Sequence, residues 1–211
     1  MSAPDYVELH ARSAFSFHRG ASAPEQLIRT AASLDLPALA ILDRNGVYSA
    51  PRAYQKGREH GIRSIVGAEL TMDDQSVLPL LVQTRQGYQN LCRLITRSQL
   101  RSPKGESQVE WSELEEFQEG LICLTGDEEG ALRQLIARRE LPKAQATLEK
   151  LIEIFGQDRV YVEIQRHHLR GENRIITQQL EFARSLKLPI MATNGVLYAT
   201  VGATRNVVAL D

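Results

Sequence analysis

The chain has 211 residues, 43% of them hydrophobic, which is enough for a continuous core in one large domain or two small ones. We interpret residues 1–211 as a single domain. Its 25 lysine and arginine residues are balanced by 26 aspartate and glutamate residues, for a formal net charge of −1. This balance excludes a global positive field of the kind that neutralises phosphates, so contact with DNA is expected to be only indirect.

The cysteine content and the absence of targeting signals predict a cytoplasmic protein. Cys92 and Cys123 lie in apolar segments without CxxC spacing, which is typical of core thiols in a reducing compartment. The first 20 residues carry no signal-peptide pattern. No apolar run approaches the roughly 18 residues needed to cross a bilayer, so no membrane partner is expected.

The spacing of apolar residues predicts strands that alternate with helices. In chain order, the predicted strands are Tyr6–Leu9, Ala38–Leu42, Ser64–Leu70, Leu78–Gln83, Gly120–Thr125, Val160–Gln165 and Pro189–Thr193. The predicted helices are Pro24–Asp35, Ser49–His60, Arg85–Ser98, Trp111–Phe117, Glu129–Arg138, Pro142–Phe155 and Glu172–Leu186. A polar turn is expected at residues 43–46 and a loop at residues 100–107.

Two helices carry more detailed signals. Pro24 suits the first position of its helix, and Ser22 lies close enough to help cap it. In the helix that begins at Arg85, helical spacing predicts an apolar face formed by Tyr88, Leu91, Cys92 and Ile95.

Polar residues with chemical potential fall at or just beyond the carboxyl ends of most predicted strands. They are His10, Asp43, Glu69, Asp127, His167 and Asn194. In a barrel these ends converge on one face, whereas an open sheet would spread them along a crevice. We therefore predict the α/β class and a (β/α) barrel with about seven strands.

On this geometry an imidazole and carboxylate cluster is expected, formed by His10, Asp43, Glu69 and His167. Such a ligand set suits Zn, Mn or Fe. In the alternative interpretation, the histidines are ordinary loop residues and the carboxylates cap helices or form ion pairs. The sequence contains no nucleophile elbow, P-loop or dinucleotide fingerprint, which removes several common classes of enzyme.

A basic stretch with neighbouring glutamates has two interpretations. Its cations are Arg93, Arg97, Arg101 and Lys104, and Glu106 and Glu110 follow closely. The cations could contact phosphates, or they could form an ion-paired, solvated face, and the interspersed glutamates favour the solvated face.

Five segments resemble the PHP (polymerase and histidinol phosphatase) domain at the N-terminus of bacterial DNA polymerase III alpha subunits. They are YVELHARSAFSFHRGAS, LAILDRNGVYSAPRAYQKGREHGIRSIVGAEL, YQNLCRLITRSQL, YVEIQRHH and PIMATNGVLYA. The Asp-Arg-Asn turn, the Lys-Gly-Glu loop and the Arg-His-His run are most similar to the error-prone paralogue. The resemblance runs in order from Tyr6 to Thr200, and residues 201–211 form a divergent tail.

The resemblance implies a distorted seven-stranded barrel whose metal-competent members hold three metal ions for phosphoesterase or proofreading exonuclease activity. His10, Glu69 and His167 match ligand positions of the family. Other ligand positions, usually His, Asp, His, His, Cys, Asp and His, are occupied here by Arg12, Arg19, Arg44, Gln99, Asp127, Gly195 and Leu197. Of these residues, Asp127 could still coordinate a metal.

The arginines argue against a multinuclear cluster. A guanidinium is always protonated and has no lone pair to donate. Two unit charges about 4 Å apart interact by roughly 4 kcal/mol at an effective dielectric constant of about 20, and a divalent ion doubles that repulsion. We hypothesise that Arg12 or Arg44 neutralises Glu69 and Asp43 in place of the lost cations.

The resemblance supports one leading function and two alternatives. The leading prediction is a non-catalytic structural module without a cofactor. Its partner would be the polymerase core of the same or a partner chain, which would catalyse nucleotidyl transfer in DNA replication or repair. One alternative is a phosphoesterase or 3′–5′ exonuclease that holds one Zn or Mn ion through His10, Glu69, Asp127 and His167. The other is a gene remnant, truncated near the divergent tail.

Overall fold

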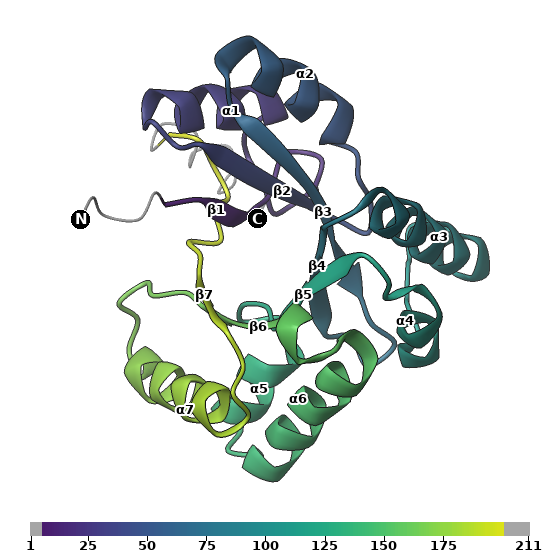
Figure 1. The fold of residues 1–211 in the computed structure, drawn as a ribbon, viewed down its shortest axis with the longest axis vertical. Coiled ribbons are helices and arrows are strands. Elements are labelled where there is room, and N and C mark those ends of the chain that lie inside the picture. The colour runs from purple at the N-terminus through teal and green to yellow at the C-terminus, as the bar shows by residue number, and fades with distance from the viewer. Residues whose placement is uncertain (1–5, 201–211) are drawn as a thin grey trace. The chain divides into compact units, whose positions relative to one another are not determined.

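The structure, a computed structural model, describes residues 6–200. Seven strands are hydrogen-bonded in sequence order as one mixed sheet (Figure 1). They are β1 (Glu8–Ala11), β2 (Ala38–Arg44), β3 (Arg63–Thr71), β4 (Val77–Val82), β5 (Leu121–Leu124), β6 (Val160–Ile164) and β7 (Ile190–Ala192). The helices are α1 (Pro24–Ser33), α2 (Ala50–His60), α3 (Arg85–Arg101), α4 (Trp111–Phe117), α5 (Ala131–Ala137), α6 (Leu141–Phe155) and α7 (Glu172–Ser185).

All the predicted strands and helices are present, and the differences lie at their boundaries. β1 begins at Glu8 rather than at Tyr6, and β2 continues to Arg44 through residues expected to form a turn. Helix α3 continues to Arg101, which places the first two residues of the expected loop in the helix. A short 3₁₀ helix before β6, Gln157–Arg159, was not predicted. No helix in the described part of the chain is long and apolar enough to cross a membrane.

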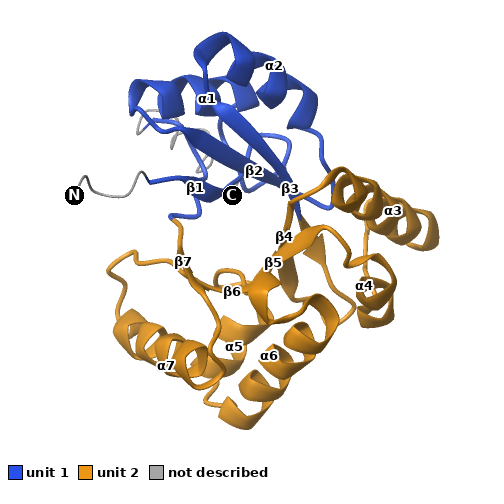
Figure 2. Cartoon of the chain, viewed as in Figure 1, with its two compact units in different colours: residues 1–68, 194–211 blue, residues 69–193 orange. Residues whose placement is uncertain are grey.

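The chain divides into two compact units, shown in blue and orange in Figure 2. Unit 1 comprises residues 1–68 and 194–211, and unit 2 comprises residues 69–193. The boundary falls inside β3, so Glu69 continues a strand that begins in unit 1. The single domain expected from the sequence is therefore made of two units. The divergent tail, residues 201–211, lies outside the described residues.

Unit 1 packs helices α1 and α2 on parallel strands. β1 and β2 pair with Glu8 opposite Leu39 and Ala11 opposite Ile41. The chain that follows β7 returns to β1, where Val196 forms a parallel bridge with Ala11. The core of this unit contains buried residues from both strands and both helices, including Leu27, Ile28, Ala31, Leu39, Ile41 and Ala53.

The first turn of α1 is held differently from the prediction. The Ser22 hydroxyl does not cap the helix, because it accepts a hydrogen bond from the Ala199 main-chain N at 2.9 Å. The Gln26 side chain instead accepts a hydrogen bond from Ala23 N at 2.9 Å. Ser22 therefore connects the start of α1 to the returning chain, while Pro24 occupies the first helical turn as predicted.

Unit 2 contains both antiparallel and parallel strand pairs. β4 and β5 are antiparallel with Leu80 opposite Cys123, whereas β5 with β6 and β6 with β7 are parallel. The sheet is thus mostly parallel, as predicted. Cys123 is completely buried, and burial raises the pKa of its thiol far above the ordinary value, as expected for a core cysteine. Cys92 is only partly buried.

The buried face of α3 differs from the predicted one. The buried residues are Gly87, Asn90, Leu91, Leu94 and Ser98, while Tyr88 is 41% exposed. One polar residue and one glycine explain why the buried face of α3 is rotated relative to the predicted face. The Asn90 amide donates a hydrogen bond to the Glu119 carbonyl at 3.0 Å, and Gly87 allows the helix to approach the turn before β5.

The approach at Gly87 leaves no room for a side chain. A Cβ atom at this position would lie 1.9 Å from the carbonyl oxygen of Gly120. The same contact includes the helix cap, because the Thr84 hydroxyl accepts a hydrogen bond from Gly87 N at 3.1 Å. Gly120 itself has φ +72°, a conformation that favours glycine.

We expect Gly87→Ala to destabilise the chain by about 1–3 kcal/mol, because either α3 or the turn at Gly120 must move. Helix propensity alone would predict a gain of about 0.5–1 kcal/mol for this change, so the sign of the effect is informative. Urea unfolding measures the difference. The matched control is Gln89→Ala at an exposed position of the same helix, and equal unfolding midpoints for the two variants would contradict the prediction.

Candidate metal centre

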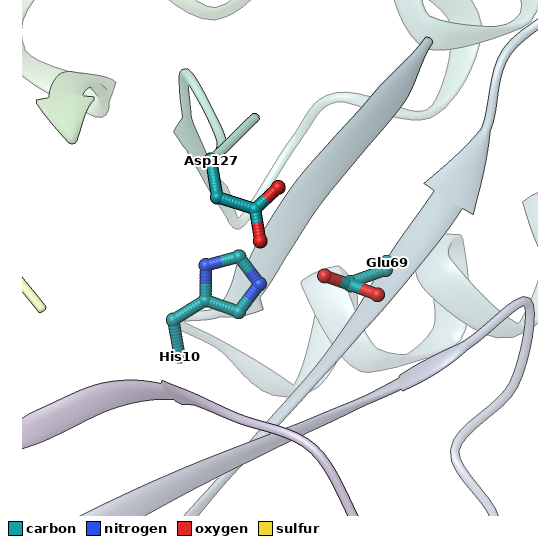
Figure 3. Close-up of side chains that lie close together, drawn as sticks. All are labelled: His10, Glu69 and Asp127. Carbon is teal, nitrogen blue, oxygen red and sulfur yellow. The ribbon is translucent and has the colours of Figure 1, made fainter. Parts of the chain in front are cut away.

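Three of the predicted site residues lie close together. His10 from β1, Glu69 from β3 and Asp127 from the turn after β5 each offer one ligand atom, and these atoms lie within 4.8 Å of one another (Figure 3). All three residues are buried. In the family resemblance, His10 and Glu69 match ligand positions, and Asp127 is a replacement that could still coordinate.

A buried glutamate that the sequence analysis did not single out holds the strand at His10. The Glu8 carboxylate accepts a hydrogen bond from His10 N at 2.8 Å through one oxygen. Its other oxygen accepts hydrogen bonds from the Tyr6 hydroxyl at 2.7 Å and from Asn194 N at 2.9 Å. The available signal was its position two residues before His10, because alternate residues of a strand share a face.

Asp127 is presented by a tight turn. β5 ends at Leu124, and Gly126 follows with φ +81°, which a residue with a side chain rarely adopts. The Asp127 carboxylate accepts a hydrogen bond from Glu129 N at 3.0 Å, which fixes the side chain within the turn.

The donor set fits one metal ion. One imidazole nitrogen and two carboxylate oxygens suit Zn, Mn or Fe, and three protein ligands leave a coordination position open. Among the residues that the structure describes, this is the only group of three or more histidine, cysteine or acidic residues close enough to hold an ion. A site for three ions would need further ligands.

Asp43 is held by hydrogen bonds from hydroxyls and main-chain amides. One carboxylate oxygen accepts from Ser13 N at 3.1 Å, from the Ser13 hydroxyl at 2.7 Å and from the Ser16 hydroxyl at 2.9 Å. The other oxygen accepts from Ser49 N at 3.0 Å. Within residues 6–200 its recorded partners are hydroxyls and amides, and the hypothesis that Arg12 or Arg44 neutralises Glu69 and Asp43 stays a prediction.

His167 does not join the cluster, although it matches a ligand position of the family. It is exposed, and its Nε2 atom lies 3.2 Å from Oε1 of the buried Gln165. Its main-chain N donates to both oxygens of Glu172, at 3.0 and 2.9 Å. The sequence placed His167 at the correct strand end, but β6 ends at Ile164 and the side chain lies three residues beyond it.

The replaced ligand positions are distributed over several elements. Arg44 ends β2, Gln99 lies on α3, and Arg12 is buried just after β1. The main chain of three of these residues helps to connect the loops of unit 1. Arg12 N donates to Val196 O at 2.8 Å, Arg19 N donates to Ser16 O at 3.0 Å, and Leu197 O accepts from Ala21 N at 2.8 Å. Gly195, at another replaced position, has φ +58°.

The basic residues of α3 form ion pairs with α4. Arg101 binds the Glu113 carboxylate through two nitrogens, at 2.8 and 3.0 Å, and Arg97 binds Glu116 at 2.6 Å. Burial is the largest single influence and would raise the pKa of Glu113, but the hydrogen bonds from Arg101 and Glu110 N and the charges of Arg101 and Arg97 together outweigh it, and the pKa is lowered. The interpretation as an ion-paired face is therefore confirmed for these arginines.

A second ion pair, also buried, lies beside His167. Arg133 of α5 binds Glu172 at the start of α7, with 3.2 Å between the charged groups. Burial alone would raise the pKa of Glu172, but hydrogen bonds from His167 N and Arg133 outweigh burial and lower the pKa. Glu172 therefore remains ionised near neutral pH and fixes the loop that carries His167.

We expect Asp43→Asn to destabilise the chain by about 1–3 kcal/mol, because an amide NH₂ cannot accept the hydrogen bonds that both carboxylate oxygens receive. Thermal or urea unfolding measures the loss. Asp35→Asn is the matched control, because Asp35 is exposed and has φ +54°, which asparagine tolerates. A cost for Asp43→Asn no larger than that of the control would contradict the prediction.

We expect Glu172→Gln to lower the free energy of unfolding at pH 7 by about 1–3 kcal/mol. We also expect that free energy to fall less steeply in the variant as the pH is lowered. Because the folded pKa is lowered, the carboxylate stabilises the fold above its unfolded pKa, and this contribution is lost as the pH falls through the folded pKa. Unfolding between pH 7 and about 3 measures the effect. Glu181→Gln, at an exposed position of α7, should leave the acid dependence unchanged.

Comparison with known proteins gives the family. Residues 8–167 match the PHP domain. The error-prone DNA polymerase of Pseudomonas fluorescens is 38% identical over 193 residues, which cover 90% of this chain and 17% of that protein. The DNA polymerase III subunit alpha of Treponema pallidum is 30% identical over 213 residues, which cover 94% and 18%. The chain thus spans less than a fifth of the length of these relatives.

Solved structures show the same fold at low sequence identity. A protein of Bifidobacterium adolescentis, provisionally named a metal-dependent phosphoesterase, aligns with a TM-score of 0.61 and 14% identity over 98% of this chain and 96% of that one. An amidohydrolase of Chromobacterium violaceum aligns with a TM-score of 0.56 and 13% identity, over 91% and 87%. These likenesses confirm the predicted seven-stranded, distorted (β/α) barrel class. The match over residues 8–167 shows that the chain belongs to the PHP domain family.

Proposed function

We propose that this chain is a PHP module of an error-prone type of DNA polymerase III alpha subunit and that the module is structural rather than catalytic. The observation that carries the proposal is that two residues expected to bind metal, Asp43 and His167, instead form hydrogen bonds with other protein groups. Asp43 receives four hydrogen bonds from protein groups, and His167 is exposed beside Gln165 and Glu172. Three donors remain, too few for the three-ion chemistry that the family resemblance implies.

The charges that replace the lost ligands support the same proposal. Arg12 is buried two residues beyond His10, and Arg44 follows Asp43 directly at the end of β2. A guanidinium cannot ligate a metal ion and repels one at close range. Replacing imidazoles with arginines therefore weakens the binding of a metal twice, by removing a ligand and by adding a positive charge.

The role of such a module would be to support a polymerase. The relatives named as DNA polymerases are more than five times longer than the aligned region, which covers 17% and 18% of them. Nucleotidyl transfer would be catalysed by parts of such a chain outside these 211 residues. We propose that the module packs against and stabilises that polymerase core, in the same or a partner chain. We also propose that it holds no cofactor and that it is cytoplasmic.

The cluster of His10, Glu69 and Asp127 favours a second candidate, a hydrolase with one Zn or Mn ion. A bound ion would supply a water molecule with a lowered pKa as the nucleophile. In this candidate, His10 and the two carboxylates would hold the ion. Glu8 would act on the main chain of β1, because its hydrogen bond to His10 N fixes the backbone that carries the imidazole.

Metal content and hydrolysis separate the two candidates. The chain would be purified without chelator, and its Zn and Mn content and its hydrolysis of bis(p-nitrophenyl) phosphate would be measured beside those of His10→Ala. We expect well below one ion per chain and no turnover that depends on His10. His60→Ala, at an exposed position on α2, controls for adventitious binding by histidine. One ion per chain, with turnover lost in His10→Ala and kept in His60→Ala, would establish the hydrolase.

A further inference from the structure

We propose that unit 1 binds single-stranded DNA on a surface formed by residues 9–24, which include the loop between β1 and α1, and residues 44–58, which include α2 (Figure 1). We call this the aromatic-basic surface. The choice of DNA over RNA rests on the proposed place of the chain in a DNA polymerase. The choice of a single strand rests on the side chains themselves.

The composition of these two segments departs from that of the whole chain. Neither segment contains an aspartate or a glutamate, although the complete chain has a formal net charge of −1. Their exposed or partly exposed cationic side chains are Arg19, Arg44, Arg52, Lys56 and Arg58, with His18 among them, whereas Arg12 is buried. The nearby carboxylates of Glu25 and Glu59 are paired with Arg52 and Lys56, which limits their repulsion of a phosphate backbone.

The same segments expose aromatic rings. Phe17 is 80% exposed at the loop after β1, Tyr48 is 54% exposed before α2, and Tyr54 on α2 is 59% exposed. A phenylalanine exposed to this degree contributes little to the core, and most of its side chain is accessible for stacking. Nucleic-acid bases stack on such rings with little dependence on sequence, because every base has a π face.

The loop that carries Phe17 is held in one conformation before any ligand binds. The hydroxyls of Ser13 and Ser16 on either side of the turn bind Asp43, and Gly20 N donates to Ser16 O at 3.0 Å. A Cβ atom on Gly20 would lie 2.0 Å from the Ser13 carbonyl oxygen, so the loop folds tightly back on itself. The backbone that carries Phe17 is ordered in this way and therefore loses little conformational entropy on binding.

Direct contacts join the two segments into one surface. The Ser16 hydroxyl accepts a hydrogen bond from Arg44 N at 3.1 Å. The Arg52 guanidinium lies 5.5 Å from the centre of the Phe15 ring, a cation–π contact from α2 to the loop after β1. Aromatic and basic groups from both segments can therefore contact one continuous strand.

Stacking, rather than charge, should dominate the binding. Arg52 is paired with Glu25, and Lys56 is paired with Glu59, so two of the cations are already compensated by carboxylates outside the segments. We therefore expect a weak dependence on salt. We also expect a preference for single strands, because the faces of bases in a duplex are covered by their neighbours.

The test measures binding of the 211-residue chain to a labelled oligo(dT) of about a dozen nucleotides by fluorescence anisotropy. We expect Phe17→Ala to weaken binding about tenfold and Phe17→Trp to retain it, since one stacked base can contribute an effect of this size. The matched control is Leu100→Ala on α3, because Leu100 is 83% exposed and lies outside the surface. Ultraviolet cross-linking followed by peptide mapping should locate thymine on residues 9–24.

The inference is overturned if the wild-type chain shows no saturable binding, if Phe17→Ala binds as tightly as Leu100→Ala, or if a duplex of the same length competes equally well. Cross-links confined to residues outside both segments would also overturn it. These outcomes are separate from those of the metal experiment. If the chain holds no metal and Phe17→Ala binds normally, the structural role is supported and this inference is removed. If the chain holds one metal ion and Phe17→Ala weakens binding, the structural role is removed and this inference is supported.

Discussion

The buried carboxylate of Asp43 is the constraint on which the arrangement of unit 1 depends. Its four hydrogen bonds join the end of β2 to the loop after β1, through Ser13 and Ser16, and to the first turn of α2, through Ser49. A buried charge without such partners would be costly. The end of β2, the loop after β1 and the start of α2 must therefore come together around the Asp43 carboxylate. Both the conformation of the exposed Phe17 loop and the start of α2 follow from this one residue.

The same constraint bears on the proposal that the module is structural. In a metal centre, cations compensate buried carboxylates, and losing the cations would leave those charges unsatisfied. Here hydroxyls and main-chain amides compensate Asp43, and amides together with Arg133 compensate Glu172. The stability of the fold therefore does not require a metal ion to compensate these two carboxylates. The group of His10, Glu69 and Asp127 is not needed for that purpose.

The fold was largely predictable from the sequence, whereas the site was predictable only in part. The spacing of apolar residues predicts the strands and helices. The polar residues at strand ends included His10 and Glu69, which the structure places in one group. The buried face of α3 was missed because it is formed partly by Gly87 and Asn90, which carry no apolar signal. The partners of Asp43 were missed for a related reason, since two of its serines lie about thirty residues away along the chain.

The return of the chain to β1 has a consequence for synthesis on the ribosome. Unit 1 is discontinuous, and the residues that pair with the chain beyond β1, including Val196 and Leu197, emerge only after all of unit 2. Until then, one edge of β1 keeps unpaired main-chain groups, and Glu8 lacks the amide of Asn194. Unit 2 can therefore fold first, and the part of unit 1 that is made before it is completed only after it.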